Sequence, residues 1–198
     1  ELVTDFGMPS PRVTIIPFGI NNTCPSTALG YREARERIAL GPGEKVLLFF
    51  GQIAPYKGLE YLVSAFNELA KQDPDYRLLI VGKVKRGYSG YWNEIQSRLG
   101  AREICRRVST RIEHVPDKEV EWYFKASDVV VIPYIEIFQS GVPFLSYSFG
   151  LPVIATDVGS LREDIIEGET GFLCRPRIQP TWRGQSAHIS PVTCINSW

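Results

Sequence analysis

The sequence predicts an α/β fold with a doubly wound parallel sheet and helices on both of its faces. Short runs of Val, Ile, Leu and Phe recur along the 198 residues. These runs are apolar on both faces, which is typical of strands buried inside a parallel sheet. Each run is followed by a longer stretch with apolar residues at helical spacing. Because parallel strands need crossover connections, this alternation favours one sheet covered by helices.

Five apolar runs are the expected strands, and a weaker run is a candidate sixth. They stand at residues 13–16, 46–50, 78–81, 129–132 and 153–155, and the weaker run at 112–115. Pro152 precedes the last strand, which has the character of an edge strand because proline cannot donate to a ladder.

Three stretches place apolar residues on one helical stripe. Their members are Leu59, Leu62, Val63, Phe66 and Leu69 in the first, Trp92, Ile95 and Leu99 in the second, and Val120, Tyr123 and Phe124 in the third. Residues 177–198 show no sustained period and carry two prolines, so we expect an irregular tail there.

Charge and composition exclude several classes of function. The 22 Lys and Arg balance the 22 Asp and Glu, which argues against a broad nucleic-acid or anionic-membrane surface but leaves room for a local anion site. The cysteines and histidines do not have metal-ligand spacing, so no metal is expected. The chain shows neither a bilayer-spanning apolar run nor a signal-peptide start, which favours a cytoplasmic protein.

Ligands of such sheets bind beyond the carboxyl ends of the strands, so the segments that follow the strands are the candidate site. They are residues 51–58, 82–90, 115–117, 133–141 and 156–160. Much of their Gly, Pro, Ser and Thr content is also ordinary turn chemistry.

The segment GQIAPYKG at 51–58 places Lys57 at the start of a predicted helix. A lysine there opposes the positive end of the helix dipole, so local stability does not explain it. An anion bound by the ammonium group and free backbone N–H groups does explain it, and a solvated turn lysine is the alternative.

A second constellation follows the strand at 129–132. Glu136 and Gln139 stand in the connecting loop, and Ser140 and Gly141 open a predicted helix, with Ser140 as its N-cap. A capped helix without a ligand explains Ser140, but it does not explain the two polar residues, which favour contact with a bound substrate. Asp117 is expected to cap the third helix. His114 either faces a bound base or is an ordinary surface or core histidine.

Six segments together resemble the C-terminal half of group 1 (family 4) retaining glycosyltransferases. In chain order they read IPFGI at 16–20, GQIAPYKG at 51–58, LIVG at 79–82, ASDVVVIP at 126–133, GLPVIAT at 150–156 and GETGFL at 168–173. The resemblance covers about residues 11–176 and implies a single Rossmann-like domain, one half of a GT-B enzyme. It divides the chain into an interdomain remnant at 1–12, the donor-binding domain at 13–176 and a tail at 177–198 that does not resemble the family.

The resemblance implies transfer of a hexose from a UDP-, GDP- or ADP-sugar to an acceptor hydroxyl, with retained configuration and no obligatory metal. The acceptor, a glycan or a lipid-linked glycan, would bind a missing N-terminal domain, so this chain alone should be inactive. The full-length enzyme would be cytoplasmic, with peripheral membrane association as an open alternative. A truncated or frameshifted reading is our hypothesis for the tail.

The same resemblance assigns roles to individual residues. Lys57 and Glu136 match catalytic positions. The donor would contact residues from four loops: Gly51, Gln52, Lys57, Gly82, Lys83, His114, Val115, Gln139, Ser140, Gly141 and Val142.

Two positions depart from the family pattern. Gln52 stands where the family has a phosphate-binding arginine, and Leu145 stands where it has the second of two glutamates. The chain resembles the subgroup whose loop reads Gln-Ser-Gly-Val, in which Gln139 takes over part of the polar role. These departures keep a second class open, a non-catalytic nucleotide-binding module; a sugar-nucleotide epimerase or a glycan phosphorylase matches less well.

Overall fold

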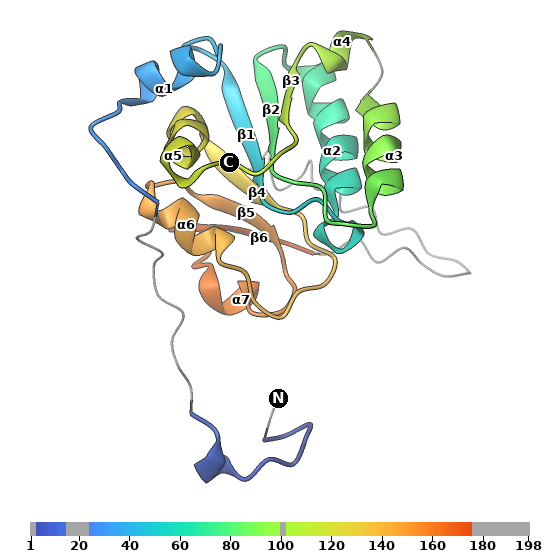
Figure 1. The fold of residues 1–198 in the computed structure, drawn as a ribbon, viewed down its shortest axis with the longest axis vertical. Coiled ribbons are helices and arrows are strands. Elements are labelled where there is room, and N and C mark those ends of the chain that lie inside the picture. The colour runs from blue at the N-terminus through green and yellow to red at the C-terminus, as the bar shows by residue number, and fades with distance from the viewer. Residues whose placement is uncertain (1–2, 15–23, 100–101, 176–198) are drawn as a thin grey trace.

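A computed structural model describes residues 3–14, 24–99 and 102–175 and contains one sheet of six parallel strands (Figure 1). The strands are β1 (Lys45–Phe50), β2 (Tyr76–Val81), β3 (Val108–Arg111), β4 (Val129–Ile132), β5 (Val153–Thr156) and β6 (Gly171–Cys174). Their order in space is β3-β2-β1-β4-β5-β6, so the chain winds outward from β1 in one direction and then from β4 in the other. The loops after β1 and β4 therefore diverge at the middle of the carboxyl edge, which is where open sheets of this kind bind ligands.

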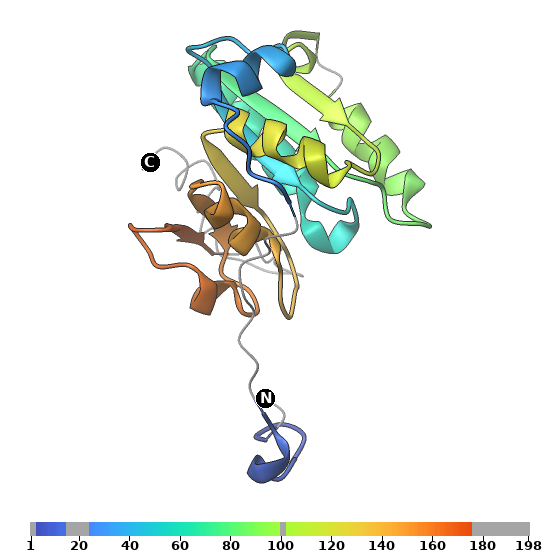
Figure 2. The same cartoon turned by 60° about the vertical axis from the view of Figure 1, so that its left-hand side comes forward.

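Helices cover the sheet on both faces, as Figures 1 and 2 show. They are α1 (Tyr31–Arg37), α2 (Leu59–Gln72), α3 (Ser89–Leu99), α4 (Arg102–Cys105), α5 (Asp117–Ala126), α6 (Val142–Ser148) and α7 (Leu161–Asp164). Two short 3-10 turns, η1 (Ser10–Arg12) and η2 (Pro55–Lys57), complete the described elements.

Alternation along β1 separates two apolar cores. Val46 and Leu48 pack with α1, α5 and the elements after β4, whereas Leu47 and Phe49 pack on the opposite face against α2 and α3. All four side chains are buried, which is why the strand reads as an unbroken apolar run. The expected strands at 46–50, 78–81, 129–132 and 153–155 and the three expected apolar helical stripes are confirmed.

The third strand is placed differently from the expectation. β3 spans Val108–Arg111, and the weaker apolar run at 112–115 lies in the loop that follows it. β3 lies at the edge of the sheet and is only partly buried, so its residues need not be apolar. Pairing with β2 determines where β3 lies instead. In this pairing Leu78 is opposite Val108, and Val81 is opposite Arg111.

Two further differences concern the other end of the sheet. β5 is not an edge strand, because it pairs with both β4 and β6. β6 and the short helix α1 were not expected, since neither presents a long apolar period. The expected strand at 13–16 is absent at Val13 and Thr14, and its other two residues lie outside the described part of the chain, as does the tail.

Both predicted N-caps are displaced by one residue. Gly141 is the N-cap of α6, so Ser140 lies one position before it. Pro116 is the N-cap of α5, and Asp117 is the first helical residue, where its charge still complements the helix dipole. Neither N-cap residue makes a side-chain capping hydrogen bond.

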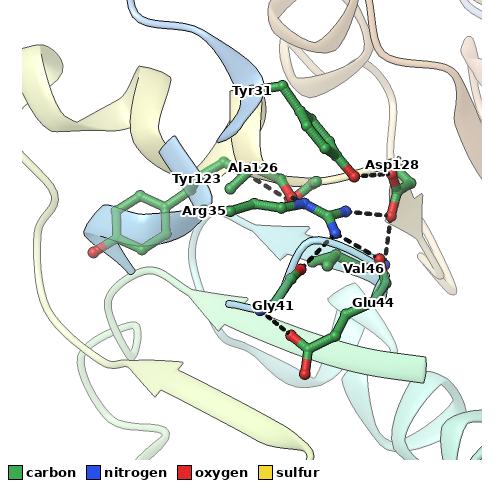
Figure 3. Close-up of polar contacts among 9 residues, drawn as sticks. Tyr31, Arg35, Gly41, Glu44, Val46, Tyr123, Ala126 and Asp128 are labelled. Carbon is green, nitrogen blue, oxygen red and sulfur yellow. Dashed lines mark hydrogen bonds and ion pairs between the residues drawn. The ribbon is translucent and has the colours of Figure 1, made fainter. Parts of the chain in front are cut away.

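A buried arginine joins three elements at the amino edge of the sheet (Figure 3). Arg35 of α1 is 1% exposed and donates hydrogen bonds to the carbonyl oxygens of Ala126 (3.0 Å), Gly41 (3.0 Å) and Glu44 (2.7 Å). Its fourth bond, 2.8 Å long, is an ion pair with Asp128. The guanidinium group is thus satisfied by the protein itself.

Asp128 connects this hydrogen-bond network to the sheet. The backbone N–H of Val46 in β1 donates to its carboxylate at 2.7 Å, and the Tyr31 hydroxyl donates at 3.2 Å. The Tyr31 ring also lies against the Arg35 guanidinium, 4.1 Å from its centre. The network anchors α1 to the starts of β1 and β4.

Candidate functional site

Two glycines bring the loops at the carboxyl edge into backbone contact. A Cβ atom on Gly82 would lie 1.8 Å from the carbonyl oxygen of Gly51, so the loops after β1 and β2 touch. A Cβ on Gly58 would lie 2.0 Å from the oxygen of Pro133, in the loop after β4. Both glycines also have positive φ values, +145° and +62°, which other residues rarely adopt. Glycine is therefore required at both positions.

Backbone hydrogen bonds hold the same loops in register. The N–H of Ile53 donates to the Lys83 oxygen at 2.9 Å, and the N–H of Lys85 donates to the Ile53 oxygen at 3.0 Å. On the other side, the N–H of Ile135 donates to the Tyr56 oxygen at 2.9 Å. The loop after β1 thus lies between the loops after β2 and β4, and all three form one edge.

Lys57 is buried in the middle of this edge. It is 9% exposed, and its ammonium nitrogen lies 3.5 Å from the centre of the Tyr134 ring. Burial lowers the pKa of Lys57 to about 8. Among the residues that the structure describes, it has no anionic partner. A desolvated cation that faces an aromatic ring and lacks a counterion is well suited to bind an anion.

Tyr134 connects Lys57 to the start of α6, and sequence reasoning missed it. Its ring is 1% exposed, burial raises the pKa of its hydroxyl, and Ser140 Oγ donates to that hydroxyl at 3.5 Å. An aromatic residue two positions beyond the end of β4 was the available signal.

The start of α6 lies beside the loop after β1. Ser140 is buried, and its Oγ accepts a hydrogen bond from the N–H of Val142 at 3.3 Å. A Cβ on Gly51 would lie 4.0 Å from the Val142 side chain. Ser140, Val142, Gly51 and Lys57 are therefore brought together, as their assignment to one site requires.

In contrast to the buried Lys57, Tyr134 and Ser140, two polar side chains in the loop after β4 are exposed. Glu136 and Gln139 are both exposed, and Gly141 is an exposed backbone position. In the part of the chain described by the structure, Glu136 has no ion pair or hydrogen bond through its carboxylate. Both side chains are available for a ligand that lies against the edge.

The positions on the β2 and β3 side are spread over a wider area. Gln52 and Lys83 are exposed beside Gly51 and Gly82, so they belong to the same edge. His114 is exposed in the loop after β3, and the order of the sheet places β2 between this loop and β1. Val115 is 6% exposed and packs in the core, so its side chain is not available to a ligand.

Leu145, at the place of the second family glutamate, is also part of the core. A ligand therefore receives no polar contact from this side chain. The described residues contain no group of three or more His, Cys, Asp or Glu that suits a metal ion. Within the described ranges, no helix has the length and apolar character needed to cross a membrane.

The strand order and the loops define a Rossmann-like α/β domain with one candidate site at its carboxyl edge. The chain belongs to the group 1 glycosyltransferase family, whose model, described as "Glycosyl transferases group 1", matches residues 44–182. This match extends over the whole described sheet and all three loops of the edge.

Individual proteins agree with this family assignment. The D-inositol 3-phosphate glycosyltransferase of Nocardia farcinica is 34% identical over 197 residues, which are 92% of this chain and 40% of that protein. The chain thus spans about two fifths of the length of this curated relative.

Two solved structures share the fold. The C-terminal domain of a glycosyl transferase group 1 family protein (LpcC) from Francisella tularensis has a TM-score of 0.69 at 20% identity, covering 80% of this chain and 81% of that domain. Anabaena Alr3699/HepE in complex with UDP has a TM-score of 0.73 at 21% identity, covering 91% of this chain and 45% of that one. The described domain thus has the fold of one GT-B half.

Proposed function

We propose that this chain is the donor-binding domain of a retaining glycosyltransferase that transfers a hexose from a nucleotide-sugar to an acceptor hydroxyl. The observation that carries the proposal is Lys57, a buried cation without a described anionic partner, placed where three loops meet. UDP-, GDP- and ADP-sugars all present the diphosphate that such a cation binds, and the complex of Anabaena Alr3699/HepE with UDP supports the same class of donor.

The residues of the edge would act on the leaving group. As the bond to the sugar breaks, negative charge develops on the diphosphate, and Lys57 and the backbone at the start of α6 are preorganised beside it. The cation–π contact with the Tyr134 ring would stabilise the ammonium group without neutralising its charge. Removing a preorganised group of this kind from similar sites costs about 2 to 4 kcal/mol of transition-state stabilisation.

Other residues would position the rest of the donor. Glu136 and Gln139 lie on the exposed loop after β4 and would contact the sugar and ribose hydroxyls. Gly82, Lys83 and the segment at His114 would border the base and ribose. The acceptor, a glycan or lipid-linked glycan, would bind a separate domain. The whole protein would be a cytoplasmic enzyme of polysaccharide or glycoconjugate synthesis that requires no metal. It would either stay soluble or associate with a membrane surface.

A second candidate function is binding of a nucleotide or nucleotide-sugar without catalysis. Two observations favour it: Gln52 is neutral, and Leu145 is buried in the core. A protein that binds a nucleotide-sugar but transfers no sugar to any acceptor, with all of its domains present, would support this alternative.

Calorimetric titration of the chain with UDP, GDP and ADP tests donor binding directly. We expect one of the three diphosphates to bind, and we expect Lys57→Met to weaken its binding by tenfold or more, on the order of one charge-assisted hydrogen bond. If none of them binds at millimolar concentration, the donor-domain proposal is wrong.

A further inference from the structure

The loop after β2 carries three positive side chains that the described protein does not neutralise. These side chains lie within four positions of each other and belong to Lys83, Lys85 and Arg86. In the described ranges none of the three forms an ion pair. At the amino ends of β1 and β2, by contrast, the cations are paired. Lys45 pairs with Asp73 at 2.6 Å, and Arg77 pairs with Glu44 at 2.7 Å. A chain with no net charge therefore keeps an unbalanced positive loop at the candidate site.

The position of Lys85 in this loop is fixed by the backbone. Its N–H donates to the Ile53 oxygen at 3.0 Å, and Val84 forms an isolated parallel bridge with Ile53. The Val84 side chain packs against the core formed with α2 and α3. Lys85 is thereby held next to the loop that contains Gln52 and Lys57, rather than at the free tip of a hairpin.

Lys85 and Lys57 both lie near the aromatic ring of Tyr56. The ammonium nitrogen of Lys85 lies 5.0 Å from the centre of the Tyr56 ring, and that of Lys57 lies 5.4 Å from the same centre. The two ammonium groups thus approach the same ring from neighbouring loops, and neither has an anionic partner among the described residues. A diphosphate, with more than one negative charge and several acceptor oxygens, can bind two such cations at once.

We propose that Lys85 is a second phosphate-binding cation of the site and acts together with Lys57 on the diphosphate of the donor. This inference rests on the proposed function and adds to it a residue from a different loop. Gln52, in the loop after β1, is exposed and neutral, so that loop offers the ligand only the charge of Lys57. Lys85 brings the second charge from the loop after β2.

The test compares Lys85→Ala with Arg86→Ala in calorimetric titrations of the 198-residue chain. The ligand is whichever of UDP, GDP and ADP binds the parent chain most tightly. Arg86 is the matched control, because it is the next residue, is exposed, carries the same charge and has no described contact with the Tyr56 ring. We expect Lys85→Ala to weaken binding by about tenfold, the effect of one charge-assisted hydrogen bond, and Arg86→Ala to weaken it by less than about twofold.

Each outcome separates the two proposals. Equal losses in the two variants mean that the loop acts only through its general charge, and they overturn the role of Lys85. No loss in Lys85→Ala together with a large loss in Lys57→Met also overturns it, while donor binding at Lys57 stands. A parent chain that binds none of the three diphosphates overturns both. Because Lys85 is exposed, circular dichroism and thermal unfolding should be the same for Lys85→Ala and the parent.

Discussion

The two edges of the sheet each bury a cation, and they treat it in opposite ways. At the amino edge, Arg35 gives its hydrogen bonds to three carbonyl oxygens and to Asp128, so its charge is satisfied within the fold (Figure 3). At the carboxyl edge, Lys57 lies over Tyr134 and has no described counterion. The first arrangement stabilises the domain, and the second leaves a buried ammonium group that we propose binds the donor.

The chemistry of the two side chains fits this division. A guanidinium group has five donors in a fixed plane and stays charged under all ordinary conditions, which suits a closed network between α1, β1 and β4. An ammonium group is a compact charge whose pKa shifts readily on burial. The difference predicts that changes at the amino edge affect stability and changes at the carboxyl edge affect binding.

The largest effect is expected at the amino edge. Arg35→Met should lower the free energy of unfolding by about 3 to 5 kcal/mol, because Asp128 would remain without its cation. Urea unfolding followed by circular dichroism measures it. Arg37→Met is the control, since Arg37 forms an exposed pair with Glu33 and lies 5.4 Å from the centre of the Trp122 ring, contacts that should each contribute about 1 kcal/mol or less. Equal losses in the two variants would remove the distinction between a network and a surface pair.

The next largest effect concerns the contact between the loops after β1 and β2. Gly82→Ala should cost about 2 to 3 kcal/mol in unfolding free energy and should also weaken diphosphate binding, because its Cβ cannot fit 1.8 Å from the Gly51 oxygen. Gly87→Ala separates steric overlap from backbone strain. Gly87 has φ +91° but open space around its Cβ, so about 1 kcal/mol is expected. A Gly82→Ala variant as stable as Gly87→Ala would contradict the close approach.

Lys57→Met should separate stability from binding. We expect weaker diphosphate binding, as above, together with an unfolding free energy equal to or higher than that of the parent at pH 7, because the variant removes a desolvated charge that lacks a described partner. Chemical denaturation and calorimetry on the same preparation give both quantities. A destabilised Lys57→Met would mean that the lysine supports the fold, as Arg35 does.

A smaller effect should follow from pH. Since burial lowers the pKa of Lys57 from 10.5 to about 8, the free site loses its charge as the pH rises through 8, while the diphosphate stays ionised. The dissociation constant should therefore rise, by up to about tenfold for each pH unit above that value. Titrations at pH 7, 8 and 9 measure it, and Lys57→Met should show a flat profile. A flat profile in the parent chain would contradict the assignment of the binding charge to Lys57.

The same lysine shifts stability with pH in the opposite direction. In the absence of a ligand, the unfolded chain keeps its proton up to about pH 10.5, whereas the folded chain releases it near 8. The unfolded state binds more protons in that window, so the contribution of Lys57 to stability increases as the pH rises from 8 to 10.5. Comparing denaturation of the parent and of Lys57→Met over this range isolates the contribution.

Local pattern was sufficient for the parts of the fold that are buried on both sides. β1, β2 and β4 are continuous apolar runs, and α2, α3 and α5 carry a clear apolar stripe, so each could be read from its own residues. β3 and β6 could not be located, because an edge strand is selected by pairing with its neighbour, and pairing is not visible in a single segment.

Residue type and position likewise pointed to Lys57 and Ser140, and the family resemblance pointed to Gly51 and Gly82. The sequence by itself thus determined the fold class, the family resemblance and the loops in which a site lies. Tertiary structure alone decided that Lys57 is buried over Tyr134, that Lys57 and Lys85 both lie near the Tyr56 ring, and that Leu145 is buried in the core. These relations join residues from different loops, and only packing of the loops against one another brings such residues within contact distance.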